Sequence, residues 1–190
     1  MKSLNVMLSL LLVFTTMAIA ADSDMKKAPA FTLPGSDGEQ HSLSDFKDAE
    51  AIVVMFIATR CPISNNFNER MVELADQYQD KGVVFLGINS NKQEDMAEVK
   101  KHANEHGFPF VVLKDKDNVI ADKYKAKVTP EVYVLNSDMS VLYHGRIDDS
   151  ADADERKHTD LSDALDEILA GEDVSTAQTK AFGCTIKRIS

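Results

Sequence analysis

Apolar and polar positions follow one another along this chain in blocks that predict alternating strands and helices. Residues 52–57 form the unbroken apolar run Ile-Val-Val-Met-Phe-Ile, which is too short for a core helix and rich in β-branched side chains, so it predicts a buried strand. From residue 67 to residue 78, apolar side chains recur at helical spacing, and Gly82 follows where a left-handed residue often ends a helix. Cys61-Pro62-Ile63-Ser64 lies between the two, so a cysteine is predicted where a central strand leads into a helix.

The same alternation continues as far as residue 171. The predicted elements are strands at 83–88, 110–113, 131–135 and 141–146 and helices at 93–106, 118–124 and 161–169. Strands that alternate with helices indicate a parallel sheet with right-handed crossovers. The last two strands, joined by the polar segment 136–140, predict an antiparallel hairpin. Near the start, segment 28–34 carries two prolines and therefore predicts a short edge strand.

Residues 1–20 have the pattern of a secretory signal peptide. Lys2 precedes an apolar core at 7–14, and the small residues Ala18 and Ala20 follow. The core is shorter than the roughly 20 apolar residues that a membrane span requires, which disfavours the alternative of an uncleaved anchor. We therefore expect cleavage after Ala20 and export to the periplasm or the outside of the cell.

The rest of the chain suits one domain with a single sizeable core. We expect a lead-in linker at 21–27, the domain at 28–171, and a C-terminal tail at 172–190 that carries Cys184. The formal net charge of −10 argues against nucleic acids and anionic membranes as partners, because both repel an acidic surface.

A strand, Cys-Pro-Ile-Ser and an amphipathic helix resemble the active site of the thioredoxin fold, with Ser64 in place of a second cysteine. The opening Ala-Pro-Ala-Phe-Thr-Leu-Pro at 28–34 and Ser-Leu-Ser-Asp-Phe at 42–46 are similar to the start of the redoxins, that is, AhpC/TSA-type peroxiredoxins and TlpA-like thiol oxidoreductases. Gly-Cys-Thr-Ile-Lys near the C-terminus resembles the tail of a peroxiredoxin-like branch. The resemblance implies an α/β thioredoxin-like fold, with a central mixed β-sheet flanked by helices on both faces.

Thr129-Pro130 is a second motif with a place in this resemblance. In thioredoxin-like proteins such a Thr-Pro bond is cis, lies beside the redox cysteine and offers backbone groups to a substrate chain, so Thr129 and Pro130 are candidate substrate-binding residues. An ordinary trans proline at a strand start is the alternative. The resemblance also implies an extra strand–helix unit between the active-site helix and this proline. No carboxylate occurs in 51–57, where relatives bury one, and Glu131 is a candidate substitute.

Cys61 is the candidate nucleophile. At a helix N-terminus the unpaired N–H groups favour a thiolate, so we expect the pKa of its thiol to lie below about 8.5, and the neighbouring Arg60 to add to the effect. Arg60, Pro62 and Ser64 are therefore candidate site-shaping residues. A small, unreactive buried cysteine is the alternative. Cys184 is the other cysteine of the chain, and two cysteines in an exported protein suggest a disulfide or a redox pair.

Three functions remain open at this point. The first is an exported thiol–disulfide oxidoreductase, with Cys61 as redox-active thiol, Cys184 as resolving partner, and protein or low-molecular-weight thiols and disulfides as partners. The second is a thiol-dependent peroxidase acting on peroxide, although Ala58 and Val54 stand where the peroxiredoxin pattern has Thr and Pro. The third is a non-catalytic binding protein whose Cys61–Cys184 bond is structural, a bond worth about 5 kcal/mol in the chain-entropy model.

No cofactor and no metal are predicted. His102 and His106 have the i, i+4 spacing of one helix face, but surface histidines at this spacing are common. The acidic stretch 148–155 lacks the Gly and the final acidic residue of an EF-hand loop, so we interpret it as a solvated loop.

Overall fold

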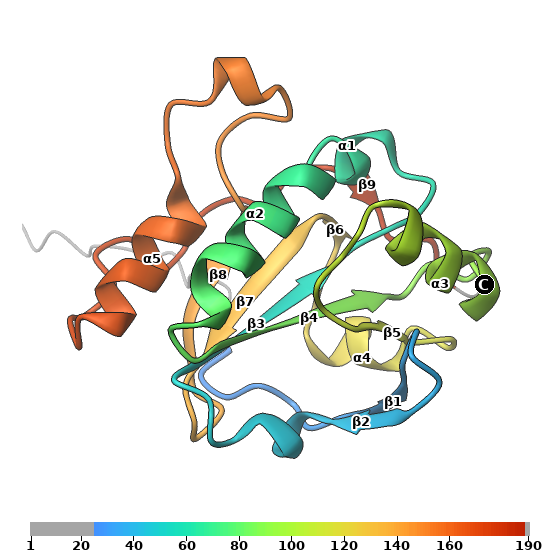
Figure 1. Cartoon of the computed structure of the whole chain (residues 1–190), viewed down its shortest axis with the longest axis horizontal. Coiled ribbons are helices and arrows are strands. Elements are labelled where there is room, and N and C mark those ends of the chain that lie inside the picture. The colour runs from blue at the N-terminus through green and yellow to red at the C-terminus, as the bar shows by residue number, and fades with distance from the viewer. Residues whose placement is uncertain (1–24, 189–190) are drawn as a thin grey trace, which may run out of the picture.

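The computed structural model describes residues 25–188 and has a five-stranded sheet at its centre, with the strand order β5-β4-β3-β7-β8 (Figure 1). Strands β3, β4 and β5 are parallel, whereas β7 is antiparallel to both of its neighbours. The strands are β1 (Thr32–Pro34), β2 (Gln40–Ser42), β3 (Ala51–Phe56), β4 (Val83–Asn89), β5 (Val112–Lys114), β6 (Val128–Thr129), β7 (Glu131–Leu135), β8 (Val141–Gly145) and β9 (Cys184–Thr185). The predicted mixed sheet and terminal hairpin are confirmed.

Helices cover both faces of this sheet, as predicted (Figure 1). They are α1 (Pro62–Asn65), α2 (Asn68–Gln79), α3 (Met96–Glu105), α4 (Val119–Lys123) and α5 (Asp160–Leu169), with short 3₁₀ turns at η1 (Leu43–Phe46) and η2 (Ala153–Glu155). Val53 and Met55 of β3 face one apolar cluster with α2, α3 and α5, and Ile52, Val54 and Phe56 face a second cluster with α4 and η1. Every residue of β3 is buried, which explains its unbroken apolar sequence.

The helix predicted after Cys61 is divided into two parts. Helix α1 ends at Asn65, and α2 begins at Asn68 after Phe67 as its N-cap. Gly82 follows with the positive φ of 84° that was expected beyond the helix end. The helix predicted from residue 93 begins only at Met96, because the Asp95 side chain accepts a hydrogen bond from the Glu98 N–H and so caps α3 there.

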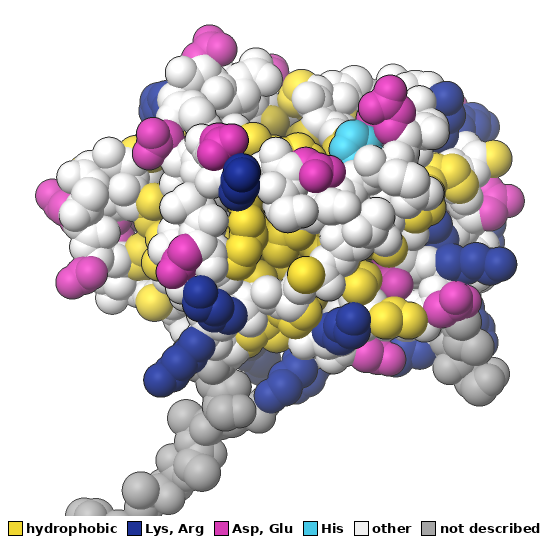
Figure 2. Space-filling view, turned by 90° about the horizontal axis from the view of Figure 1, so that it is seen from below, with side chains coloured by type: hydrophobic (Ala, Val, Ile, Leu, Met, Phe, Trp, Pro, Cys, Tyr) yellow, Lys and Arg dark blue, Asp and Glu magenta, His cyan; other side chains and the backbone are white. Residues whose placement is uncertain are grey.

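The face seen in Figure 2 has apolar side chains gathered in its middle, with basic and acidic side chains around them. Among the large apolar side chains that the structure describes, Val119 is exposed, with 48% of its surface accessible. No helix within residues 25–188 has the length and apolar character that crossing a bilayer requires. The predicted signal peptide at 1–20 lies outside the described residues.

A buried ion pair fixes α2 to the segment that follows β8. The guanidinium of Arg70 donates to Asp148 at 2.5 Å, and these side chains are 5% and 2% exposed. The same guanidinium also donates to the carbonyl oxygens of Asn66, Ser150 and Ala151. This one side chain therefore satisfies backbone groups at the break between α1 and α2 and in the acidic stretch that was predicted to be a loop.

We expect Asp148→Asn to destabilise the protein by about 3–5 kcal/mol, because the arginine charge would stay buried without its counter-charge. The matched control is Glu105→Gln, which breaks the exposed Lys101–Glu105 pair (3.7 Å) and should leave stability unchanged. Urea unfolding followed by circular dichroism measures both variants. Equal effects of the two substitutions would contradict the importance of the buried pair.

Candidate functional site

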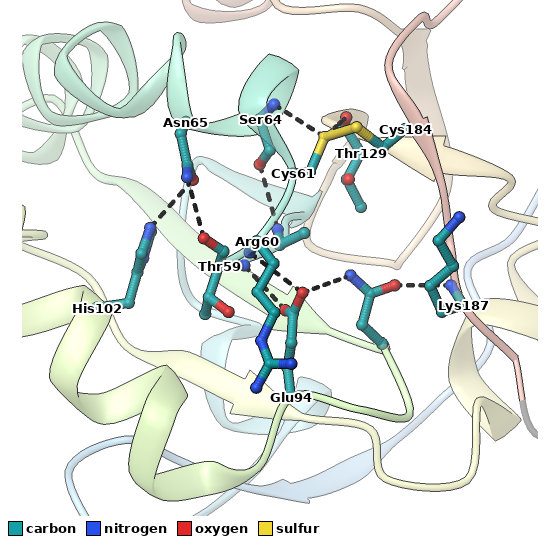
Figure 3. Close-up of a disulfide and its surroundings, with 12 residues drawn as sticks. Thr59, Arg60, Cys61, Ser64, Asn65, Glu94, His102, Thr129, Cys184 and Lys187 are labelled. Carbon is teal, nitrogen blue, oxygen red and sulfur yellow. Dashed lines mark hydrogen bonds between the residues drawn. A yellow bond between two sulfur atoms is a disulfide. The ribbon is translucent and has the colours of Figure 1, made fainter.

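Cys61 and Cys184 form a disulfide in the structure (Figure 3). Their Cα atoms are 5.9 Å apart although 123 positions separate them in sequence, and the predicted pairing is confirmed. Cys61 is 4% exposed, whereas Cys184 is only partly buried. The bond joins the end of the loop that follows β3 to strand β9 in the C-terminal tail.

Cys61 is the N-cap of α1, and its local environment is polar. Its Sγ accepts a hydrogen bond from the Ser64 N–H at 3.2 Å and lies 3.5 Å from the Thr129 carbonyl oxygen. Because α1 has four residues, its aligned dipoles contribute less than the longer helix that the sequence predicted. The direct stabilisation of charge on the sulfur therefore comes from one N–H group. Pro62 occupies the first helical position, where a backbone N–H would have no acceptor within the helix, so the N–H that proline lacks is not missed.

Ser64 has a structural role that its sequence position did not reveal. Its side chain is fully buried, and its Oγ accepts the N–H of Ala58 at 3.2 Å. The hydroxyl therefore holds the start of the loop that leads to Cys61. Ser64 lies where a second thiol would be in a Cys-x-x-Cys motif, but here it fixes the backbone on both sides of the cysteine.

Arg60 does not point toward the sulfur (Figure 3). Its guanidinium donates to both carboxylate oxygens of Glu98, at 2.8 Å and 2.5 Å, and Glu98 also accepts the Thr59 hydroxyl. The hydrogen bonds from Arg60 lower the pKa of Glu98 to about 2. Arg60 thus links the loop to α3, and the expected direct support of a thiolate by its charge has no contact in the structure.

Glu94 is a residue of the site that the sequence analysis missed. Its carboxylate is 1% exposed and accepts the backbone N–H groups of Thr59 at 2.9 Å and Arg60 at 3.2 Å. It also accepts the side-chain amides of Asn89 at 2.5 Å and Asn91 at 2.9 Å. One carboxylate therefore holds the two residues that precede Cys61. The polar break after the predicted strand 83–88 was the only sequence signal of this arrangement.

Thr129 and Pro130 lie beside the disulfide, as the resemblance implied. The Thr129–Pro130 peptide bond is cis, and both residues are buried. Thr129 pairs with Cys184, and Val128 with Thr185, where β6 and β9 run antiparallel. The backbone next to Pro130 is thus occupied by the chain's own tail.

Glu131 supports the segment before Pro130. Its buried carboxylate accepts the N–H groups of Lys127 at 2.7 Å and Val128 at 3.1 Å, and it contacts the His144 ring at 2.8 Å. Burial alone would raise the pKa of Glu131, but these hydrogen bonds outweigh it, so the pKa lies below its ordinary value. Glu131 is buried, as expected of a substitute for the missing carboxylate. Its contacts, however, are with the Pro130 segment, His144 and Tyr133 and not with the sulfur.

His102 belongs to the same hydrogen-bonded surroundings (Figure 3). Its Nε2 lies 3.1 Å from Oδ1 of Asn65, and the Asn65 amide donates to the Thr59 carbonyl oxygen at 3.0 Å. Burial lowers the pKa of His102, and the neighbouring His106 lowers it further by a smaller amount. Within residues 25–188, no three His, Cys, Asp or Glu side chains are grouped as a metal site would require.

Comparison with known proteins relates this chain to two kinds of thiol protein. Residues 25–144 match the AhpC/TSA family. A Coxiella burnetii protein, provisionally named peroxiredoxin bcp, is 32% identical over 106 residues, which are 54% of this chain and 66% of that one. Thiol-disulfide oxidoreductase ResA of Halalkalibacterium halodurans is 25% identical over 122 residues, 64% of each chain. The chain thus spans just under two thirds of the length of these relatives.

Solved structures show the same fold. An uncharacterized conserved protein from Geobacillus kaustophilus has a TM-score of 0.80 and 37% identity, over 85% of this chain and 90% of that one. The thioredoxin domain of thiol-disulfide oxidoreductase BVU-2223 from Bacteroides vulgatus has a TM-score of 0.57 and 21% identity, over 64% and 89%. The fold is therefore thioredoxin-like, as predicted.

We expect Glu94→Gln to destabilise the protein by about 2 kcal/mol or more, because each carboxylate oxygen accepts two N–H groups, and the two at one oxygen lose their acceptor when NH₂ replaces it. Glu98→Gln is the matched control, since Glu98 belongs to the same site but pairs with an arginine side chain that is 57% exposed, and it should change stability little. Chemical denaturation of the oxidised proteins gives the change in unfolding free energy for both variants. A larger loss in the control would show that the loop depends on Glu98 instead.

Proposed function

The chain belongs to the AhpC/TSA family, and from that premise we propose that it is an exported thiol–disulfide oxidoreductase with Cys61 as the redox-active thiol and Cys184 as its resolving partner. The observation that carries the proposal is the pairing of these two cysteines beside Thr129, at the end of a fully buried central strand. Thiol proteins of both named kinds among the relatives support it. The residues that act would come from this chain alone, with no cofactor.

The reaction requires two exchanges. In the reduced protein, the Cys61 thiolate attacks one sulfur of a substrate disulfide, a mixed disulfide forms, and the other substrate sulfur leaves as a thiolate. The Cys184 thiolate then attacks Cys61 Sγ, which restores the internal bond and releases the second substrate thiol. Two electrons pass from the protein to the substrate. The Ser64 hydroxyl has no redox chemistry and already accepts the Ala58 N–H, so Cys184 is needed for the second step.

The other site residues would hold the backbone around the two cysteines in place and would not react themselves. Thr129 and Pro130 would present backbone groups next to the reacting sulfurs, and Pro62 and Ser64 would hold the turn that carries Cys61. Arg60 would act through α3, where its partner Glu98 lies, and Glu131 through the segment that precedes Pro130. Export is supported by the leader pattern at 1–20 and by the disulfide itself, since such bonds persist mainly in oxidising compartments. The partners would be thiols and disulfides.

A thiol-dependent peroxidase is the second candidate, favoured by the family match and by the relative named as a peroxiredoxin. The site offers little to polarise an O–O bond, however. Ala58 stands in place of the threonine of the peroxiredoxin pattern, the hydroxyl of Thr59 is bonded to Glu98, and so is the guanidinium of Arg60. A structural disulfide in a binding protein is the third candidate, and redox titration separates it from the first.

We expect the Cys61–Cys184 bond to open and close reversibly across a graded glutathione redox buffer, with one two-electron transition. Mass-spectrometric thiol mapping at each ratio measures it. Cys61→Ala and Cys184→Ala are the controls, and each should leave one thiol that forms only a mixed disulfide with glutathione. A bond that resists every ratio except strong reductant would identify a structural disulfide. Alkylation of the reduced protein against pH then tests the roles, because reaction of Cys184 first at low pH would reverse them.

We expect the reduced protein to consume hydrogen peroxide no faster than about 10-fold above a free thiol, because no group of the site is placed to stabilise the developing oxyanion. Peroxide loss under pseudo-first-order conditions gives the rate constant, and Cys61→Ala gives the background. A rate constant that exceeds the free-thiol value by several orders of magnitude, and that is lost in Cys61→Ala, would make the peroxidase the better assignment.

A further inference from the structure

The tail is held on the domain by contacts that do not involve the disulfide. Beyond Cys184, the side chain of Ile186 is 3% exposed within the apolar cluster that contains α4, and its N–H donates to the Lys127 carbonyl oxygen at 3.0 Å. The Lys187 N–H donates to Oδ1 of Asn91 at 2.7 Å, and its carbonyl oxygen accepts the Lys92 N–H at 2.9 Å. None of these contacts involves a sulfur atom.

The tail is also held before Cys184. The Thr179 N–H donates to the His144 carbonyl oxygen of the edge strand β8 at 3.0 Å, and the His144 N–H donates to the Ala177 carbonyl oxygen at 3.0 Å. Its hydroxyl lies 2.7 Å from the Tyr143 hydroxyl. The ring of Phe182 then packs on Phe67 at a centroid distance of 5.9 Å. Cys184 therefore lies between two docked segments and not at the end of a free arm.

This docking occupies the backbone edge beside Cys61. A polypeptide whose cysteine bonded to Cys61 in the place of Cys184 would have to pair with Thr129, and β9 already does so. The fit is also close, since a Cβ atom at Gly183 would clash with the Thr129 carbonyl oxygen. An extended substrate would need to displace the whole strand, including the buried side chain of Ile186.

The partly exposed residue of the pair is Cys184, whereas Cys61 is 4% exposed. Of the two cysteines, Cys184 is therefore the more accessible residue to a thiol in solution. We infer that the disulfide is opened at Cys184 by low-molecular-weight thiols, and that extended polypeptides are excluded because the tail stays docked in both redox states. The inference rests on the proposed function and identifies the reductant as a small thiol, a partner distinct from the disulfide that the Cys61 thiolate attacks in the reduced protein.

The exchange balances without a further reactant. A small thiolate RS⁻ attacks Sγ of Cys184, the bond between the two cysteines breaks, and Cys61 leaves as a thiolate that accepts the Ser64 N–H. A second RS⁻ attacks the sulfur of R in the mixed disulfide, releases RSSR and leaves Cys184 as a thiolate, which takes a proton from water. Two thiols are oxidised to one disulfide, and the protein disulfide is reduced to two thiols.

The test compares two reductants on the oxidised protein: glutathione, and a short unstructured peptide with one central cysteine at equal thiolate concentration. We expect glutathione to be at least about 10-fold faster, because access limits the exchange rate. Acid quenching and peptide mapping should find the first glutathione adduct on Cys184. The Ile186→Ala variant has a weakened contact between tail and domain, so the ratio of the two exchange rates should decrease. The control is Ile120→Ala, which loses the same atoms from the same apolar cluster and should keep the difference.

Hydrogen exchange of the unmutated protein supplies a readout that does not depend on a variant. We expect the Ile186 amide to keep its protection within about threefold on reduction, because its bond to Lys127 does not need the disulfide. Equal rates for the two reductants, a first adduct on Cys61, or loss of Ile186 protection on reduction would each overturn the inference while thiol exchange still stands. If neither reductant opens the bond, the proposed function fails and the inference fails with it.

Discussion

The carboxylate of Glu94 is the group on which the arrangement around Cys61 depends. It is buried, yet four N–H donors point at it: the backbone of Thr59 and Arg60 and the amides of Asn89 and Asn91. A buried charge is tolerated only when it is hydrogen-bonded in this way. Because Asn91 also accepts the Lys187 N–H through its other amide atom, the same group joins the loop before Cys61 to the tail that carries Cys184. Figure 3 shows this chain of contacts from Arg60 to Lys187.

A buried cation completes the network and prevents an isolated charge. Lys114 donates from Nζ to Oδ1 of Asn89 and to the carbonyl oxygen of Asn91, both at 2.7 Å. Burial lowers the pKa of Lys114, and the nearby Glu94 acts in the opposite direction. The two charges are thus separated by amide groups that orient toward each of them. Such a network is stable only when every member has its partner, so it fixes the loop after β4 in one conformation.

A feature of the fold or the site could be predicted from the sequence when neighbouring residues carry the pattern that indicates it. Strand β3 was predictable because a strand buried on both faces must be apolar throughout, and the break before β7 was marked by a proline that no strand interior accepts. Glu94 was not predictable, because its two backbone donors, Thr59 and Arg60, lie 35 and 34 positions away in sequence. The docking of the tail was missed for a similar reason: Ile186 is one apolar residue in a polar segment, and a single residue has no periodicity.

The topology explains why cysteines so distant in sequence meet at all. Strands β3 and β7 are antiparallel neighbours with Phe56 opposite Glu131. The residues that follow β3 and those that precede β7 therefore lie at the same end of these two strands. Cys61 and Thr129 are brought together there. When β9 pairs with Thr129, Cys184 lies within bonding distance of the Cys61 sulfur. The Cys61 sulfur then lies between the Ser64 N–H and the Thr129 carbonyl oxygen. A thiol there can donate to the oxygen and a thiolate can accept from the N–H, so each protonation state has a partner. The fold therefore supplies a hydrogen-bond partner to the sulfur from each side, one from the start of α1 and one from the segment before Pro130.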